Sequence, residues 1–403
     1  MQKFSADIVF PITKPPVKNG IIVIDEEGVL MDDVLDPATL DYSVSDVETY
    51  EGFICPGFVN AHCHLELSWL KNKMPEHTGL DQFIINLENI RREGDDEKLD
   101  AIIAAEKEMI NGGILAAGDI CNTNITFPVK QKSSIHYHNF IESFASAPEK
   151  AEKAFGKALQ LYNKITSLEK NNSTSITPHA PYSLSKKLFQ LIKGHNERTG
   201  NIISIHHQES EEENKFFLTK NACLTARQGN IKDMHFRFGV ERSDFSDCGK
   251  RPLEAISSYI AKNNSLQLVH NTVATEADID FALRYFPQVF WCFCPNANLY
   301  IEQKLPDFAL FFNKGCKITL GTDSLASNKQ LSILEELKTI RNNMPFLPLH
   351  EMLRWATYNG AEFLKITSNY GSFEKGKSPG IVILENVNQA TQHLTRDSIA
   401  RIL

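Results

Sequence analysis

Short apolar runs alternate with longer amphipathic stretches through the middle of the chain. Eight of these runs have the length and the apolar, often β-branched or aromatic, content of buried strands, at residues 58–64, 114–120, 135–142, 174–181, 201–209, 266–272, 289–295 and 316–323. Between them, apolar residues recur at helical spacing, as at residues 80–93, 100–110, 186–198, 252–263 and 332–344. This alternation predicts an α/β protein with a (β/α)8 TIM barrel. A doubly wound sheet is the runner-up, but no GxGxxG turn follows an early strand to support it.

Both ends of the chain show a different pattern, with short strand-like runs broken by turns. At the N-terminal end these runs are 7–12, 21–28 and a segment ending at Gly57, and at the C-terminal end the clearest is 378–387. Each end is too small to fold alone. We therefore predict a small composite β-sandwich from residues 1–55 and 366–403, beside a catalytic barrel formed by residues 56–365. The stretch 210–251 is longer than a simple crossover needs, which predicts a helix followed by an irregular lid.

Composition narrows the class of protein. The chain is 42% hydrophobic and 23% charged, with a net charge of −8, and such an acidic balance argues against broad nucleic-acid binding. The first apolar stretch runs into Pro11, and no run approaches the ~20 apolar residues of a membrane span. The eight cysteines form no CxxC pair, which favours buried reduced thiols. We therefore expect a cytoplasmic protein with neither a nucleic-acid nor a membrane partner.

Metal-ligating side chains gather where the predicted strands end. His62 and His64 close the run 58–64 two residues apart, so they point to the same side of one strand. His206, His270 and Asp323 lie at the ends of three later strands. In a β/α barrel the active site forms at these carboxyl ends. A lone histidine at a strand end is more often structural, but this convergent set predicts one catalytic divalent metal, with Zn²⁺, Fe²⁺ or Mn²⁺ suited to imidazole and carboxylate ligands.

Six motifs occur in a recognisable order: PGFVNAHCHLE, HAPYSLS, HHQESEEE, LVHNT, FCPNANLYI and LGTDSLASN. With them the chain resembles the amidohydrolase superfamily, and within it the deaminase and chlorohydrolase branch. The resemblance implies four metal ligands, which are His62, His64, His206 and Asp323. It also implies catalytic roles beside the metal for Glu209 as a proton donor, for His270 as a stabiliser of the adduct, and for Asp323 as a base.

The resemblance also bears on the number of metal ions. Superfamily members with two metals usually carry a carboxylated lysine at the end of strand four, whereas this strand ends in TPHAP, with His179 and no lysine. We therefore expect one ion, with zinc preferred over iron or manganese. His207 competes with His206 as the ligand on strand five. The spacing to Glu209 favours His206, and strand alternation would turn His207 outward.

The residues expected to contact the substrate are less specific. They are His179, Glu66, Trp69, Asn296 and Asn298. A loop histidine bonded to backbone is the alternative for His179, and core packing is the alternative for Trp69. The acidic residues 211–213 that follow Glu209 are interpreted for the most part as a solvated run.

The motifs HLELS and HHQESEEE are most similar to those of aminodeoxyfutalosine deaminases. This similarity implies a hydrolase of carbon–nitrogen bonds that releases ammonia from a small heterocyclic substrate, a 6-aminopurine nucleoside-like compound. Guanine deaminase and triazine chlorohydrolase or amidohydrolase activities are alternatives, because these enzymes share much of the motif set. A non-catalytic barrel that binds a ligand is the third class, and it would be expected to have lost part of the site. A homodimer is possible.

Overall fold

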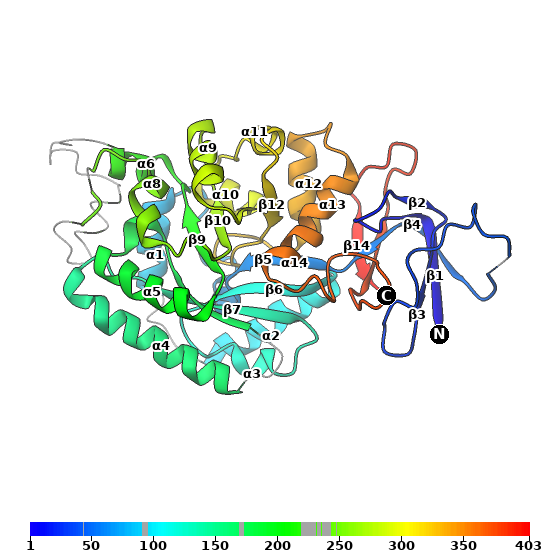
Figure 1. Ribbon diagram of the computed structural model, residues 1–403, viewed down its shortest axis with the longest axis horizontal. Helices are drawn as coiled ribbons and strands as arrows, with labels where there is room; N and C mark the ends of the chain where they lie inside the picture. Colours follow the sequence, from blue (N-terminus) through cyan, green and yellow to red (C-terminus); the bar gives the residue numbers. More distant parts are fainter. Residues whose placement is uncertain are drawn as a thin grey trace.

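The computed structural model describes residues 1–42, 44–90, 96–168, 173–218, 231, 235, 243–246 and 248–403. Eight parallel strands in two four-stranded sheets form its centre (Figure 1). The first sheet contains β5 (Phe58–Cys63), β6 (Ile114–Cys121), β7 (His136–Ser143) and β8 (Ser173–Pro178). The second contains β9 (Ile203–His207), β10 (Leu266–His270), β11 (Val289–Phe293) and β12 (Lys317–Leu320). All eight strands predicted from the apolar runs are confirmed.

Hydrogen bonds connect the two sheets at both edges. At the first edge, the backbone N–H of Asp323, just past β12, donates to the carbonyl of His62 in β5 at 3.1 Å. At the second edge, the N–H of His206 in β9 donates to the carbonyl of His179, just past β8, at 2.9 Å. The carboxyl ends of strands from both sheets therefore lie close enough to share one site.

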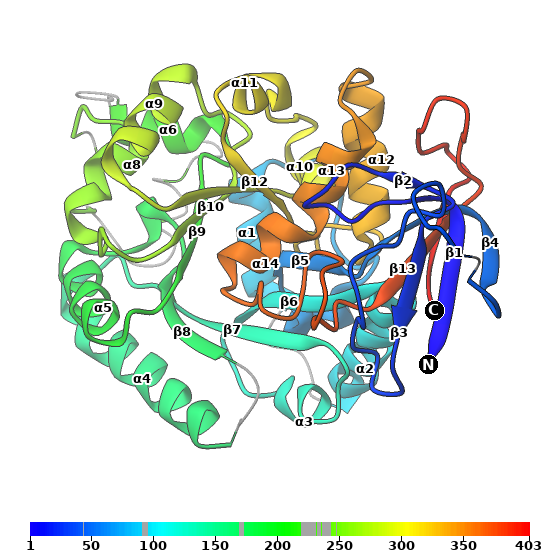
Figure 2. The ribbon, with the colours of Figure 1, turned by 45° about the vertical axis from the view of Figure 1, so that its right-hand side comes forward.

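Helices cover the outside of these strands (Figure 2). Helix α5 illustrates why the chain forms them at these places, because the Ser185 hydroxyl caps the N–H of Leu188 and Gly200 ends the helix at φ +67°. The five helices expected from the amphipathic stretches are present, with 252–263 divided into α8 (Pro252–Ile256) and a 3₁₀ turn. Apart from α8, the described residues form the following α-helices, expected or not: α1 (Leu80–Ile90), α2 (Asp96–Asn111), α3 (Phe127–Lys130), α4 (Ala151–Leu168), α5 (Lys186–Thr199), α6 (Glu211–Leu218), α9 (Glu276–Tyr285), α10 (Pro295–Glu302), α11 (Phe308–Asn313), α12 (Ile333–Asn343), α13 (Leu349–Ala356) and α14 (Tyr358–Phe363).

Strands from both ends of the chain pair in one mixed sheet of six, seen at the right of Figure 1. They are β1 (Gln2–Val9), β2 (Val17–Lys18), β3 (Ile21–Ile24), β4 (Glu48–Pro56), β13 (Ile381–Glu385) and β14 (Ile399–Ile402). The link between the two ends is the antiparallel pairing of β13 with β4. The sandwich form and the domain boundaries of the sequence analysis stay predictions.

Three further expectations concern the lid, the cysteines and membrane-spanning helices. Most of the predicted lid in residues 210–251 lies outside the described residues, and its first part forms α6. Six of the seven described cysteines are buried and none of the seven is disulfide-bonded, whereas Cys248 is exposed. In the described part of the chain, no helix has the length and apolar character to cross a membrane.

Candidate metal centre

Three imidazoles and one carboxylate meet where β5, β9 and β12 end. The His64 Nε2 atom lies 3.2 Å from His62 Nε2 and 3.3 Å from His206 Nε2. The same atom lies 3.3 Å from Asp323 Oδ1. All four side chains are buried. The structure thus brings together the four residues that the sequence analysis selected as metal ligands.

The protonation state of this histidine cluster decides what it can bind. Burial, followed by the neighbouring histidines, lowers the pKa of His62 well below its usual value and that of His206 to about 3. The Nδ1 atom of His206 lies 3.0 Å from the carbonyl oxygen of His179, which can only accept. His206 Nδ1 therefore carries the proton, and its Nε2 lone pair faces the cluster.

The spacing of these atoms provides a test of whether a metal ion fits. Nitrogen lone pairs and a carboxylate oxygen about 3 Å apart repel one another unless a proton or a cation lies between them. Ligands held tetrahedrally by zinc at about 2.0–2.1 Å are roughly 3.3 Å from one another. The three separations from His64 Nε2 are close to this value, whereas His62 Nε2 and Asp323 Oδ1 are farther apart, at 3.8 Å. The donor set therefore fits one divalent cation.

The backbone at the strand ends adopts rare conformations around the cluster. Gln208 after β9, His270 at the end of β10 and Asp323 after β12 have φ values of +45°, +72° and +56°. Non-glycine residues adopt this left-handed region rarely, and such strain is found disproportionately at functional sites. These turns direct the side chains of Glu209, His270 and Asp323 into the site.

Glu209 and His270 lie next to each other beside the cluster. Their Oε1 and Nε2 atoms are 3.8 Å apart. Burial first, and then the Asp323 carboxylate, raises the pKa of Glu209 well above its usual range, which favours the protonated form that can donate a proton. The Nδ1 atom of His270 donates to Asn298 Oδ1 at 2.8 Å, which leaves its Nε2 as an acceptor. The Ser327 hydroxyl donates to the second oxygen of Asp323 at 2.5 Å.

Three of the five residues expected to contact the substrate lie in the first half of the chain, and the structure places them in different surroundings. They are His179, Glu66 and Trp69. The His179 ring lies beside that of His206, with ring centroids 4.8 Å apart. The Glu66 carboxylate instead accepts backbone N–H groups of the loop after β6, including that of Thr123 at 3.0 Å. Trp69 is part of the hydrophobic core. Of these three residues, His179 lies next to the histidine cluster.

The remaining two expected contacts, Asn296 and Asn298, lie on different sides of α10. Residues two apart in a helix point in nearly opposite directions. Asn298 reaches His270, whereas the Asn296 side chain accepts from the hydroxyl of Thr339 in α12 at 2.6 Å. Asn298 therefore contacts the site through His270, and Asn296 connects α10 to α12.

The sequence analysis missed a buried ion pair beside the histidine cluster. The Lys130 ammonium in α3 lies 2.5 Å from the Asp119 carboxylate in β6, and both side chains are fully buried. The other Asp119 oxygen accepts the N–H of Leu65 at 2.7 Å, directly after His64. The position of Asp119 near the end of a strand was the available signal, but nothing in the sequence indicates that Lys130 is its partner.

A second surprise is Glu213, which was grouped with the solvated acidic run. Its side chain is buried, and its carboxylate accepts the backbone N–H of Glu209 at 3.2 Å. That interpretation is wrong for Glu213, because α6 begins immediately after the turn and the helix directs this residue inward. Glu211 and Glu212 are not buried and form ion pairs with Lys304 and Lys215.

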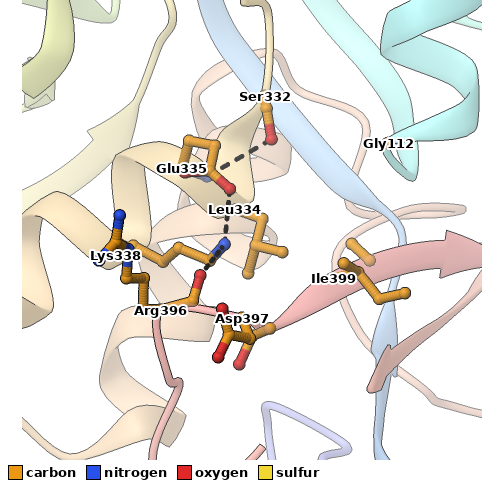
Figure 3. A pocket seen from close by; sticks show the side chains of 10 residues that line it. Gly112, Ser332, Leu334, Glu335, Lys338, Arg396, Asp397 and Ile399 are labelled. Atoms are coloured by element: carbon orange, nitrogen blue, oxygen red, sulfur yellow. Dashed lines mark hydrogen bonds and ion pairs between the residues drawn. The ribbon is translucent and has the colours of Figure 1, made fainter. Parts of the chain in front are cut away.

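A separate surface cavity of about 290 Å³ lies between the start of α12 and the C-terminal strand β14 (Figure 3). Its lining shares no residue with the histidine cluster. The Lys338 ammonium at this cavity donates to Glu335 at 2.7 Å and to the carbonyl of Arg396 at 3.0 Å. The candidate site of chemistry is therefore the cluster at the strand ends.

Known proteins that resemble this chain in sequence or in structure include deaminases and a chlorohydrolase. The adenosine deaminase of Helicobacter pylori is 26% identical over 374 residues, which are 88% of this chain and 86% of that protein. The aminofutalosine deaminase of H. pylori in complex with methylthio-coformycin superposes with a TM-score of 0.82 at 22% identity, covering 96% of this chain and 94% of that one. For the zinc-bound atrazine chlorohydrolase of Arthrobacter aurescens the TM-score is 0.72 at 16% identity, with coverages of 95% and 86%.

These structural similarities indicate the TIM-barrel fold. Residues 53–399 match the amidohydrolase family, and this range includes every residue of the histidine cluster. The chain therefore belongs to the amidohydrolase family, and it is a hydrolase that acts on carbon–nitrogen bonds other than peptide bonds.

Proposed function

We propose that the protein is a zinc-dependent deaminase that hydrolyses the 6-amino group of a purine nucleoside-like compound such as aminodeoxyfutalosine. The observation that carries this proposal is the position of the buried Glu209 carboxyl group, 3.8 Å from His270 Nε2 and beside a cluster of candidate metal ligands. His62, His64, His206 and Asp323 would hold one zinc ion. A zinc ion bound there would act as a Lewis acid and lower the pKa of water to about 7.

The residues around the ion divide the proton transfers among them. Asp323 would accept the proton of the attacking water, and Ser327 holds its second oxygen in place. His270 would accept a hydrogen bond from the attacking oxygen through Nε2, because Asn298 holds the proton on Nδ1. Positioned proton transfers of this kind typically contribute about 10²–10⁴-fold in rate.

Glu209 would protonate a ring nitrogen next to the amino-bearing carbon. This protonation makes the carbon electrophilic, so that the water oxygen forms a bond to it. The C–N bond then breaks. The departing amine takes the proton that Asp323 removed from the water and leaves as ammonia, and the hydroxyl proton of the adduct returns to Glu209. Overall, water and an aminopurine become a hydroxypurine, in its oxo form, and ammonia.

The relatives support the choice of substrate class. One is an adenosine deaminase and another a 5-methylthioadenosine/S-adenosylhomocysteine deaminase, and the aminofutalosine deaminase was solved with methylthio-coformycin. The curated relatives named here are deaminases, which favours deamination over dechlorination. His179, beside His206, is the candidate contact to the substrate ring or sugar.

The test is an ammonia-release assay on the zinc-loaded protein with aminodeoxyfutalosine, adenosine, 5′-methylthioadenosine, guanine and atrazine. We expect hypoxanthine-type products from the 6-aminopurine nucleosides. Glu209→Gln serves as the control, and its kcat should fall about 10²–10⁴-fold while its zinc content stays unchanged. Activity on guanine or atrazine alone, or full activity of the Gln variant, would overturn the proposal.

A further inference from the structure

Glu213 carries a buried carboxyl group that the proposed reaction does not use. It lies in the first turn of α6, one helical turn beyond Glu209, and its side chain is inaccessible to solvent. Its Oε2 atom accepts the backbone N–H of Glu209 at 3.2 Å. Burial raises the pKa of Glu213 to about 8, so the group is mostly neutral at pH 7.

The backbone that this carboxyl contacts is a strained turn. Gln208 has a φ of +45°, a value that a non-glycine residue keeps only where its surroundings hold it. The Gln208 side-chain amide donates to Asn214 Oδ1 at 2.8 Å. The Gln208 backbone carbonyl accepts the N–H of Val273, in the turn after β10, at 3.1 Å. Residues on both sides of the turn therefore hold the backbone that carries Glu209.

We propose that Glu213 is a positioning residue, whose carboxyl oxygen accepts the Glu209 N–H and thereby fixes the Glu209 side chain beside His270. The catalytic part of this inference rests on the proposed function, because Glu209 is the proton donor there. Glu213 belongs to none of the groups of candidate metal ligands that the described residues form. Its effect on the reaction would therefore pass through the backbone of Glu209.

The alternative role for such a group is a proton relay, and two substitutions separate the roles. In Glu213→Gln the amide oxygen still accepts the Glu209 N–H, but the group can no longer take up or release a proton. In Glu213→Met the volume is nearly kept and the acceptor is lost. Glu212→Met, on the neighbouring residue that pairs with Lys215, is the matched control.

We expect Glu213→Met to lower kcat about 10–100-fold, as a misplacement of roughly 1 Å does, with KM and zinc content within twofold of the parent. The Gln variant should retain at least a third of the parent kcat, and the Glu212→Met control should be fully active. A Met variant as active as the parent, or a Gln variant as slow as the Met variant, would overturn the inference. If the Met variant does not fold, a slow Gln variant still overturns it.

Amide hydrogen exchange provides a readout that does not depend on activity. In the zinc-loaded protein, the peptide containing residues 206–214 should exchange faster in Glu213→Met than in the parent, and Glu213→Gln should exchange like the parent. If the exchange pattern is as expected but no substrate is deaminated, the proposed function fails and the placement of Glu209 stands. If deamination occurs but exchange and kcat are unchanged, this inference fails alone.

Discussion

Two buried polar clusters lie next to each other at the carboxyl ends of β5 and β6, and they differ in how their charges are balanced. In the first, the Lys130 ammonium meets the Asp119 carboxylate, and each charge has its partner within the protein. In the second, the ligand atoms of His62, His64 and Asp323 converge within 3.8 Å of one another and form a donor set that suits a metal ion. The side chains of both clusters are buried.

The difference separates a structural cluster from a functional one. Burial alone would lower the pKa of Lys130, but the carboxylate of Asp119 more than offsets this and holds the pKa above its usual value. The ion pair therefore stays charged and complete. In the histidine cluster, burial lowers the pKa of His62 and of His206, which favours the neutral imidazoles that can bind a cation. Substitutions should accordingly affect stability in one cluster and metal binding in the other.

The largest effect is expected from His64→Ala. Its Nε2 lies within 3.3 Å of three other ligand atoms, so its loss opens the centre of the cluster. Zinc content should fall below about a tenth of the parent and activity about 10³-fold or more, since water loses its Lewis acid. Elemental analysis and the ammonia assay measure both. His350→Ala, on an exposed helix surface, is the control, and zinc retained by the His64 variant would contradict the ligand assignment.

Lys130→Met is expected to lower the free energy of unfolding rather than to abolish metal binding. It leaves the Asp119 carboxylate buried and without its counter-charge, a change that typically costs about 3–5 kcal/mol. The double variant Lys130→Met with Asp119→Asn should lose less, because no lone charge remains in the core. Urea denaturation of the zinc-loaded proteins measures the free energies of unfolding. A single variant more stable than the double variant would show that the two groups are not coupled as the structure indicates.

The contrast between the clusters also explains what could be predicted from the sequence. The eight strands were predictable because buried parallel strands are continuous apolar runs. The ligands were predictable because strand ends converge in a β/α barrel, and His62 and His64 occupy one such end. The ion pair was not, since a fully buried lysine is rare and the position of Lys130 depends on the packing of α3.

Two further differences between the sequence-based expectations and the structure arise where a helix begins immediately after a site motif. The sequence analysis placed both Asn296 and Asn298 in the pocket, but helical geometry turns Asn296 toward α12. The same effect buries Glu213 within an apparently solvated acidic run. In each case the motif could be recognised, but the start of the helix decides which side chain faces the site.

The pair Asn298→Leu and Asn296→Leu tests this difference directly. Without Asn298 the proton of His270 can move to Nε2, which removes the acceptor facing the substrate. We expect kcat to fall about 10–100-fold with zinc content unchanged. Asn296→Leu should keep kcat near the parent and lower the melting temperature slightly, because the contact to Thr339 is lost. Steady-state kinetics and thermal melts measure both, and equal losses of kcat would indicate that both residues serve the site.

The smallest effect concerns acid stability of the metal-free protein. The pKa of His206 is about 3 in the fold, mainly because of burial, against an ordinary value near 6.5. Between these values the unfolded chain binds a proton that the folded chain does not, so stability falls as the pH drops from 6.5 toward 3, by about 1.4 kcal/mol per pH unit for this one proton. The free energy of unfolding of chelator-treated His206→Gln should therefore depend less on pH by about this slope. Identical slopes would show that burial does not keep His206 neutral in the metal-free fold. The contrast between a neutral histidine cluster and the charged Lys130–Asp119 pair would then be wrong.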